Sequence, residues 1–200
     1  VKRSPNGMKH GYLFEIDARA PGVVPAVPVL AAGRMAHEAI AARNGILYLT
    51  EDRGLEGDSL LGTIGACFYR YLPDSRMRRS QNLAFSGGRL QALKLRVEFH
   101  ANMDSGRTVG AQYKVDWVTT DEPDHDDDTD QRRDRAPGFT PTRIQAQDKG
   151  AAFFDRLEGI WPTGTGPTAR IYFDCTTGGA AKLGQVWEYI PSRSVLRLIY

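Results

Sequence analysis

Apolar residues occur in short runs along the chain, and turn residues separate these runs. Residues 11–17 alternate, which places Tyr12, Phe14 and Ile16 on one face, as a half-buried strand requires. Residues 148–157 and the shorter stretch 143–147 are the only segments compatible with a helix. Further strands are expected over residues 37–41, 46–50, 67–72, 90–97, 115–118, 171–175, 185–190 and 195–200. This pattern predicts an all-β chain.

The segments 37–41 and 46–50 predict a hairpin, because Asn44-Gly45 supplies the positive φ angles of a two-residue turn. Counting outward from that turn places Glu38 directly across from Glu51. Like charges directly opposite on one sheet face are destabilising. A bound cation, protonation of one carboxyl group or exposure of both to solvent would offset this repulsion. Alternatively, both glutamates lie at a solvent-exposed edge of the sheet and form ion pairs with Arg34 or Arg53. The sequence does not decide between these possibilities.

Similar short phrases recur along the chain, each with an aromatic residue inside an expected strand. Residues 11–16, 67–72 and 184–189 are examples, and such repetition predicts the blades of a β-propeller. At roughly 40 to 50 residues per blade, residues 1–200 would form a partial propeller of about four blades. Residues 121–137 are rich in charged side chains and are interpreted as a solvated loop insertion.

Composition limits the classes of partner. The 26 basic and 24 acidic residues leave a net charge of only +2, so no global field favours nucleic acid or an anionic membrane, and strong electrostatics must be local. No stretch has the length of a transmembrane helix, and residues 1–30 lack the layout of a signal peptide. Cys67 and Cys175 are interpreted as buried thiols, with a disulfide left open.

Two positions carry further candidate chemistry. Asp52 follows Glu51 directly, and oxygen ligands in such number suit calcium, magnesium or oxidised iron. Arg156 and Glu158 are two residues apart, so in a strand both would point the same way. Such a pair can bind a metal through the carboxylate while the guanidinium holds a phosphate oxygen, or it can be a plain salt bridge. His37 would face away from Glu38 and is interpreted as a hydrogen-bonded core histidine.

Seven phrases in order resemble the PhoX-like alkaline phosphatase family of bacteria, and together they span nearly all of the chain. They are residues 10–17 (HGYLFEID), 33–39 (GRMAHEA), 48–53 (YLTEDR), 68–71 (FYRY), 88–94 (GRLQALK), 156–161 (RLEGIW) and 184–189 (GQVWEY). The resemblance implies a six-bladed propeller with a cluster of Fe³⁺ and Ca²⁺. It also implies hydrolysis of phosphate monoesters or related small-molecule phosphoesters by a monomeric, periplasmic or secreted enzyme.

On the family pattern, Glu38, Glu51 and Glu158 resemble metal ligands, with Asp52 as a further candidate. Arg156 resembles a phosphate-binding arginine, so Arg156 and Glu158 are the expected catalytic residues. The family's Thr-Cys-Glu-Glu phrase and its closing Pro-Asp-Asn phrase do not occur in this sequence. A propeller that has lost the complete metal site and serves in binding or structure is therefore the alternative function.

Overall fold

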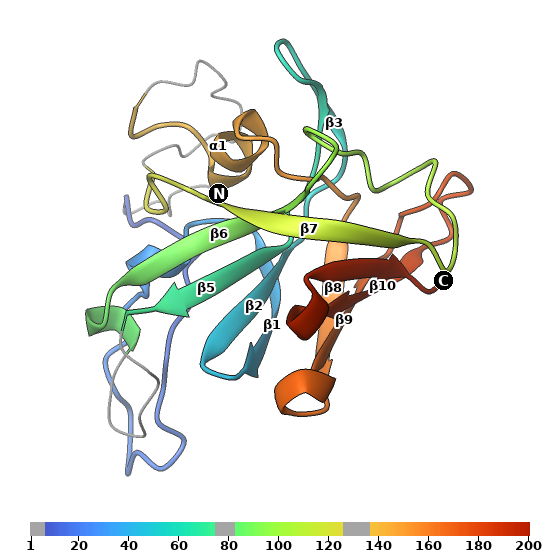
Figure 1. Cartoon of the computed structure of the whole chain (residues 1–200). Coiled ribbons are helices and arrows are strands. Elements are labelled where there is room, and N and C mark those ends of the chain that lie inside the picture. Colours follow the sequence, from blue (N-terminus) through green and yellow to red (C-terminus); the bar gives the residue numbers. More distant parts are fainter. Residues whose placement is uncertain (1–6, 75–82, 126–136) are drawn as a thin grey trace.

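The computed structural model describes residues 7–74, 83–125 and 137–200, and strands dominate it. Nine strands form one antiparallel sheet in the order β1-β2-β5-β6-β7-β11-β10-β9-β8 (Figure 1). Their bounds are β1 His37–Arg43, β2 Ile46–Glu51, β5 Tyr69–Pro73, β6 Gly88–Leu95, β7 Gln112–Thr119, β8 Leu157–Thr163, β9 Arg170–Cys175, β10 Gln185–Ile190 and β11 Val195–Leu198. Beside the sheet lie the hairpin β3 Glu56–Asp58 and β4 Gly62–Ile64, the helix α1 Thr142–Asp148, and 3-10 turns at Leu30–Ala32, Leu83–Phe85, Gly166–Thr168 and Pro191–Arg193.

The sheet curls into a nearly closed barrel. Its two edge strands, β1 and β8, are far apart in sequence but lie against each other. This approach covers the edges that an open sheet would present to solvent. It also brings the start of the predicted hairpin next to the Arg156 and Glu158 segment.

Two hydrophobic clusters lie on opposite faces of the sheet. Tyr48 belongs to the first, which fills the barrel and includes Phe68 stacked on Phe173 with ring centroids 4.2 Å apart. Leu47 and Leu49 belong to the second, on the other face of β2 and β5. Because successive side chains of a strand alternate between faces, both faces of β2 are buried. Cys67 and Cys175 are buried free thiols, as the sequence predicted.

Most of the predicted strands are confirmed, including the hairpin around Asn44 and Gly45. The strand over residues 11–17 is wrong: the segment makes one isolated bridge, from Phe14 to Pro28, and Phe14 is 50% exposed. The short helical stretch 143–147 is confirmed within α1, but the helix over 148–157 is wrong. There the backbone runs extended, and Ala152 and Phe154 donate to carbonyls of distant segments instead.

The all-β prediction is confirmed, whereas the propeller is not. The described strands form one continuous nine-stranded sheet and one small hairpin. The propeller type and the count of four blades therefore stay predictions. Most of the expected loop insertion at 121–137 lies outside the described residues.

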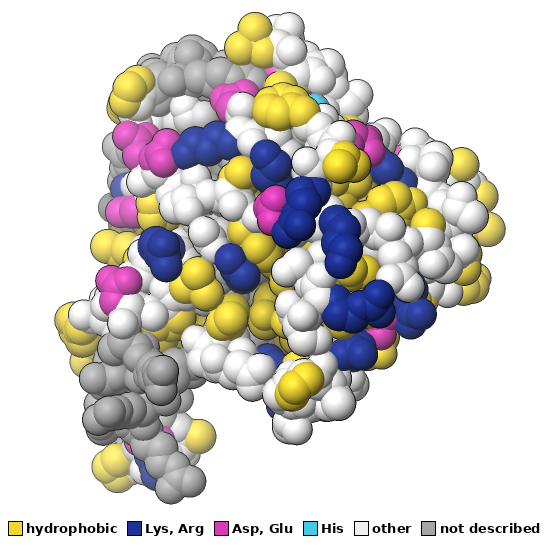
Figure 2. All heavy atoms as spheres, viewed as in Figure 1, with side chains coloured by type: hydrophobic (Ala, Val, Ile, Leu, Met, Phe, Trp, Pro, Cys, Tyr) yellow, Lys and Arg dark blue, Asp and Glu magenta, His cyan; other side chains and the backbone are white. Residues whose placement is uncertain are grey.

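Charged side chains are grouped on parts of the surface, although the net charge is small. On the face of the molecule that Figure 2 shows, basic side chains gather over β7 and β10. Ion pairs among the described residues include Arg96 with Asp116 at 3.0 Å and Arg197 with Glu188 at 2.7 Å. None of the described helices is long and apolar enough to cross a membrane.

Candidate metal centre

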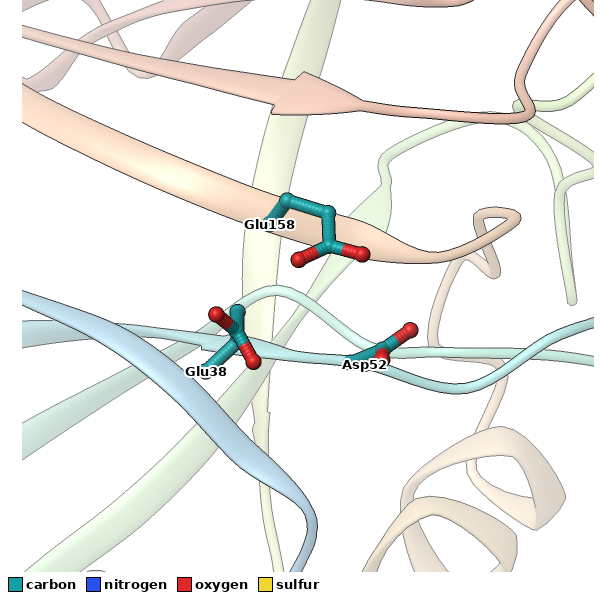
Figure 3. A group of neighbouring side chains, drawn as sticks. All are labelled: Glu38, Asp52 and Glu158. Carbon is teal, nitrogen blue, oxygen red and sulfur yellow. The ribbon is translucent and has the colours of Figure 1, made fainter.

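Three carboxylates converge where β1 and β8 meet (Figure 3). Glu38 lies on β1, Asp52 directly follows β2, and Glu158 is the second residue of β8. One oxygen from each carboxylate lies within 4.8 Å of the others. Asp52 and Glu158 are half-buried and Glu38 is exposed, so the group is open to solvent on one side. We refer to Glu38, Asp52 and Glu158 as the carboxylate cluster.

Two β-bulges, one in β1 and one in β8, orient side chains of this cluster. The pairing of β1 with β2 shifts between His37 and Ile40, around Glu38, and the pairing of β8 with β9 shifts between Leu157 and Ile160, around Glu158. A bulge adds one residue to a strand, bends it and redirects its side chains, and bulges are frequent next to active sites. Both edge strands are thus bent at the position of a cluster carboxylate.

The first bulge overturns the predicted register, because Glu51 pairs with His37 and not with Glu38. The Glu51 side chain is 1% exposed and accepts hydrogen bonds from the backbone N–H of Cys67 and the hydroxyl of Tyr69, both at 3.1 Å. Burial raises the pKa of the Glu51 carboxyl, against the opposing charge of Arg143. The structure does not bring Glu51 into the carboxylate cluster; the next residue, Asp52, is there instead.

If the carboxylate cluster holds a cation such as Ca²⁺, we expect Glu51→Gln to leave its affinity within a few-fold of wild type. The amide oxygen of glutamine can still accept from Cys67 and Tyr69, but its NH₂ group places donors beside the cationic Arg143 in a buried site, which should lower the free energy of unfolding by about 1–3 kcal/mol. Calcium titration calorimetry and urea denaturation measure the two quantities. If Glu51→Gln lowered calcium affinity as much as Glu158→Gln does, Glu51 would instead be a ligand, as the family resemblance implied.

Arg156 lies beside the cluster and contacts two of its members. Its Nε and Nη2 donate to the two carboxylate oxygens of Asp52 at 2.9 and 3.1 Å, and Nη2 also donates to Glu158 at 3.0 Å. Arg156 has a left-handed backbone, with φ of 54°, directly before β8 begins. The salt bridge between Arg156 and Glu158 is present, although Arg156 lies outside β8 and the pair does not have the strand geometry assumed from the sequence.

The electrostatics of the cluster favour a cation. Partial burial and the negative charges of Asp52 and Glu38 raise the pKa of the Glu158 carboxyl, while the positive charge of Arg156 opposes them. Hydrogen bonding to Asp52 raises the pKa of Arg156, so this side chain stays charged. Three carboxylates against one guanidinium still leave negative charge in excess.

Two hydroxyl groups that the sequence did not single out also lie at the cluster. Thr176, which follows β9, donates to Glu158 Oε1 at 3.3 Å. Thr50, on β2, donates to the backbone carbonyl of Glu158 at 2.6 Å. Both contacts join segments that are distant in sequence, so no local spacing could have indicated them.

The donor set fits a hard cation. Oxygens that share one Ca²⁺ at about 2.3–2.6 Å can be at most about 5 Å apart, and the cluster oxygens lie within 4.8 Å. All three donors are carboxylates, which suit calcium better than a thiolate-preferring metal. His37 is not among them: its Nε2 lies 3.0 Å from the carbonyl of Gly33, in agreement with the predicted hydrogen-bonded histidine.

Comparison with known proteins places this chain in a family. The family model described as alkaline phosphatase PhoX matches residues 2–198, nearly the whole chain. No curated protein and no solved structure matches it. The chain therefore belongs to the PhoX alkaline phosphatase family.

Proposed function

We propose that this protein hydrolyses small-molecule phosphate monoesters, or related phosphoesters, at a cation site held by Glu38, Asp52 and Glu158. The observation that carries the proposal is the convergence of these carboxylates within 4.8 Å, with Arg156 hydrogen-bonded to two of them. Ca²⁺ and Fe³⁺ are the proposed ions. The six-bladed propeller, the monomeric state and a periplasmic or secreted location belong to the same proposal.

When bound, cations at such a site polarise phosphoryl oxygens and neutralise charge that develops during transfer. The residues of the chain supply binding and orientation. The three carboxylates provide the oxygen ligands, and the hydroxyl of Thr176 fixes one oxygen of Glu158. A ligand so oriented keeps its geometry through the reaction, which is the condition for electrostatic stabilisation of a transition state.

Arg156 has donors left for phosphate. Its Nε and Nη2 already donate to Asp52 and Glu158. Its Nη1 makes no hydrogen bond to any described residue, and a guanidinium carries two N–H groups on that nitrogen. We assign Nη1 to the phosphate oxygens of the substrate. Asp52 and Glu158 hold the guanidinium in one orientation, so little side-chain freedom is lost when substrate binds.

The test is removal of the ions. Dialysis against a chelator should lower the turnover of a chromogenic phosphomonoester at least about 100-fold, because the cation supplies several kcal/mol of transition-state stabilisation. Adding back calcium, with or without ferric iron, should restore turnover. Elemental analysis of the purified protein identifies the ions. Undiminished turnover by stripped protein would contradict a cation-dependent phosphatase, and a protein without turnover or bound ions would favour the non-catalytic alternative.

A further inference from the structure

The hydroxyl of Thr50 joins the two edge strands of the barrel beside the carboxylate cluster. Thr50 is completely buried on β2. Its Oγ1 lies 2.6 Å from the carbonyl oxygen of Glu158, at the start of β8. The same oxygen lies 3.0 Å from the backbone nitrogen of Ala39 and 3.3 Å from its carbonyl oxygen, within the bulge of β1. One side chain therefore contacts both bulges.

The single proton of this hydroxyl can be placed. The carbonyl of Glu158 is the nearer of the two acceptors, 2.6 Å against 3.3 Å for Ala39, so the O–H donates to Glu158. The oxygen then accepts the N–H of Ala39. The bulge removes this N–H from regular pairing with β2, and a buried N–H or C=O left without a partner costs about 1–3 kcal/mol. Thr50 satisfies both groups at once.

The two backbone groups that Thr50 contacts, the N–H of Ala39 and the C=O of Glu158, lie next to the carboxylate cluster. Ala39 directly follows Glu38, and Glu158 carries its own cluster carboxylate. The like charges of Glu38 and Glu158 repel each other, which would tend to separate β1 from β8. Building on the proposed function, we propose that Thr50 is a positioning residue that sets the separation of Glu38 and Glu158 and thereby the affinity of the cation site.

An ordinary buried hydroxyl would contribute to stability alone. The chain offers a matched control in Thr120, which is 4% exposed and donates to the carbonyl of Leu90 at 3.1 Å. Thr120 is not a contact of the carboxylate cluster. Replacing either threonine by valine removes one buried hydroxyl and keeps the shape of the side chain. Only Thr50→Val should change cation binding.

Titration with Tb³⁺, followed by its luminescence, measures that binding without any substrate. Thr50→Val should lower Tb³⁺ affinity about 10–100-fold, the usual effect of removing a group that orients a metal ligand. Thr50→Ser keeps the hydroxyl and should stay within a few-fold of wild type, as should Thr120→Val. Wild-type affinity in Thr50→Val, or equal losses in Thr50→Val and Thr120→Val, would overturn the assignment while leaving the proposed function intact.

Amide hydrogen exchange tests the contact itself, independently of any cation. In the wild-type protein the N–H of Ala39 should exchange as slowly as the paired amides of β1, and in Thr50→Val it should exchange much faster. Fast exchange in wild type overturns the assignment even if the valine variant does not fold. If wild type binds no Tb³⁺, the proposed function and the effect of Thr50 on cation affinity both fail, whereas slow Ala39 exchange that depends on Thr50 would still establish the contact of Thr50 with the bulge of β1.

Discussion

Glu158→Gln should lower the turnover of phosphomonoesters at least about 10³-fold while leaving the fold intact. The substitution removes a ligand charge without changing side-chain volume, and a cation at the site supplies several kcal/mol of transition-state stabilisation, with each 1.36 kcal/mol worth a factor of ten. Steady-state kinetics, with Tb³⁺ or Ca²⁺ titration, measure the loss. Stability should change little, because Glu158 is only half-buried and Thr176 can still donate to the amide oxygen.

A matched control is Glu98→Gln, which neutralises another glutamate in an ion pair. Glu98 is bound by Arg107 at 2.7 Å and is not part of the carboxylate cluster. This variant should keep wild-type turnover and cation affinity. Near-wild-type turnover in Glu158→Gln would show that the reaction does not depend on the carboxylate cluster.

The sequence located the candidate site more accurately than it described its geometry. The hairpin turn at Asn44 and Gly45 is local, so it fixed the region in which Glu38 and Asp52 lie. At the bulge beside Glu38, the side chain of Thr50 bonds Ala39 and the carbonyl of Glu158 on β8, and no local sequence pattern indicates either contact. A one-residue shift reverses which side chains face each other, and for that reason the predicted pairing of Glu38 with Glu51 failed.

Larger errors arose where distant segments determine the backbone. Residues 148–157 have helical composition, but Ala152 and Phe154 pair with Leu93 and Ala66. Tertiary hydrogen bonding and burial outweigh propensity there. The curling of nine strands into a nearly closed barrel also involves contacts between β1 and β8, which are separated by more than half of the chain. Repeated aromatic phrases indicate strands, but they do not determine how those strands are divided among sheets.

Arg156 illustrates how the structure resolves an ambiguity of the sequence. A salt bridge and a phosphate-binding arginine were alternatives, yet the geometry accommodates both. Asp52 and Glu158 occupy Nε and Nη2, and they hold the guanidinium plane in place. Nη1 remains for a ligand. The ion pair thus preorganises the donor that the proposed function requires.

Arg156→Lys should therefore lower kcat/KM about 100-fold and weaken inhibition by inorganic phosphate, while cation affinity stays within a few-fold. An ammonium cannot bind Asp52 bidentately and also present fixed N–H groups to phosphate, and a hydrogen bond to a charged group is worth about 1.5–3 kcal/mol. The control is Arg96→Lys, in an exposed pair with Asp116 at 3.0 Å, which should leave kinetics unchanged. Unaltered phosphate inhibition in Arg156→Lys would contradict its role in substrate binding and restrict Arg156 to the salt bridge.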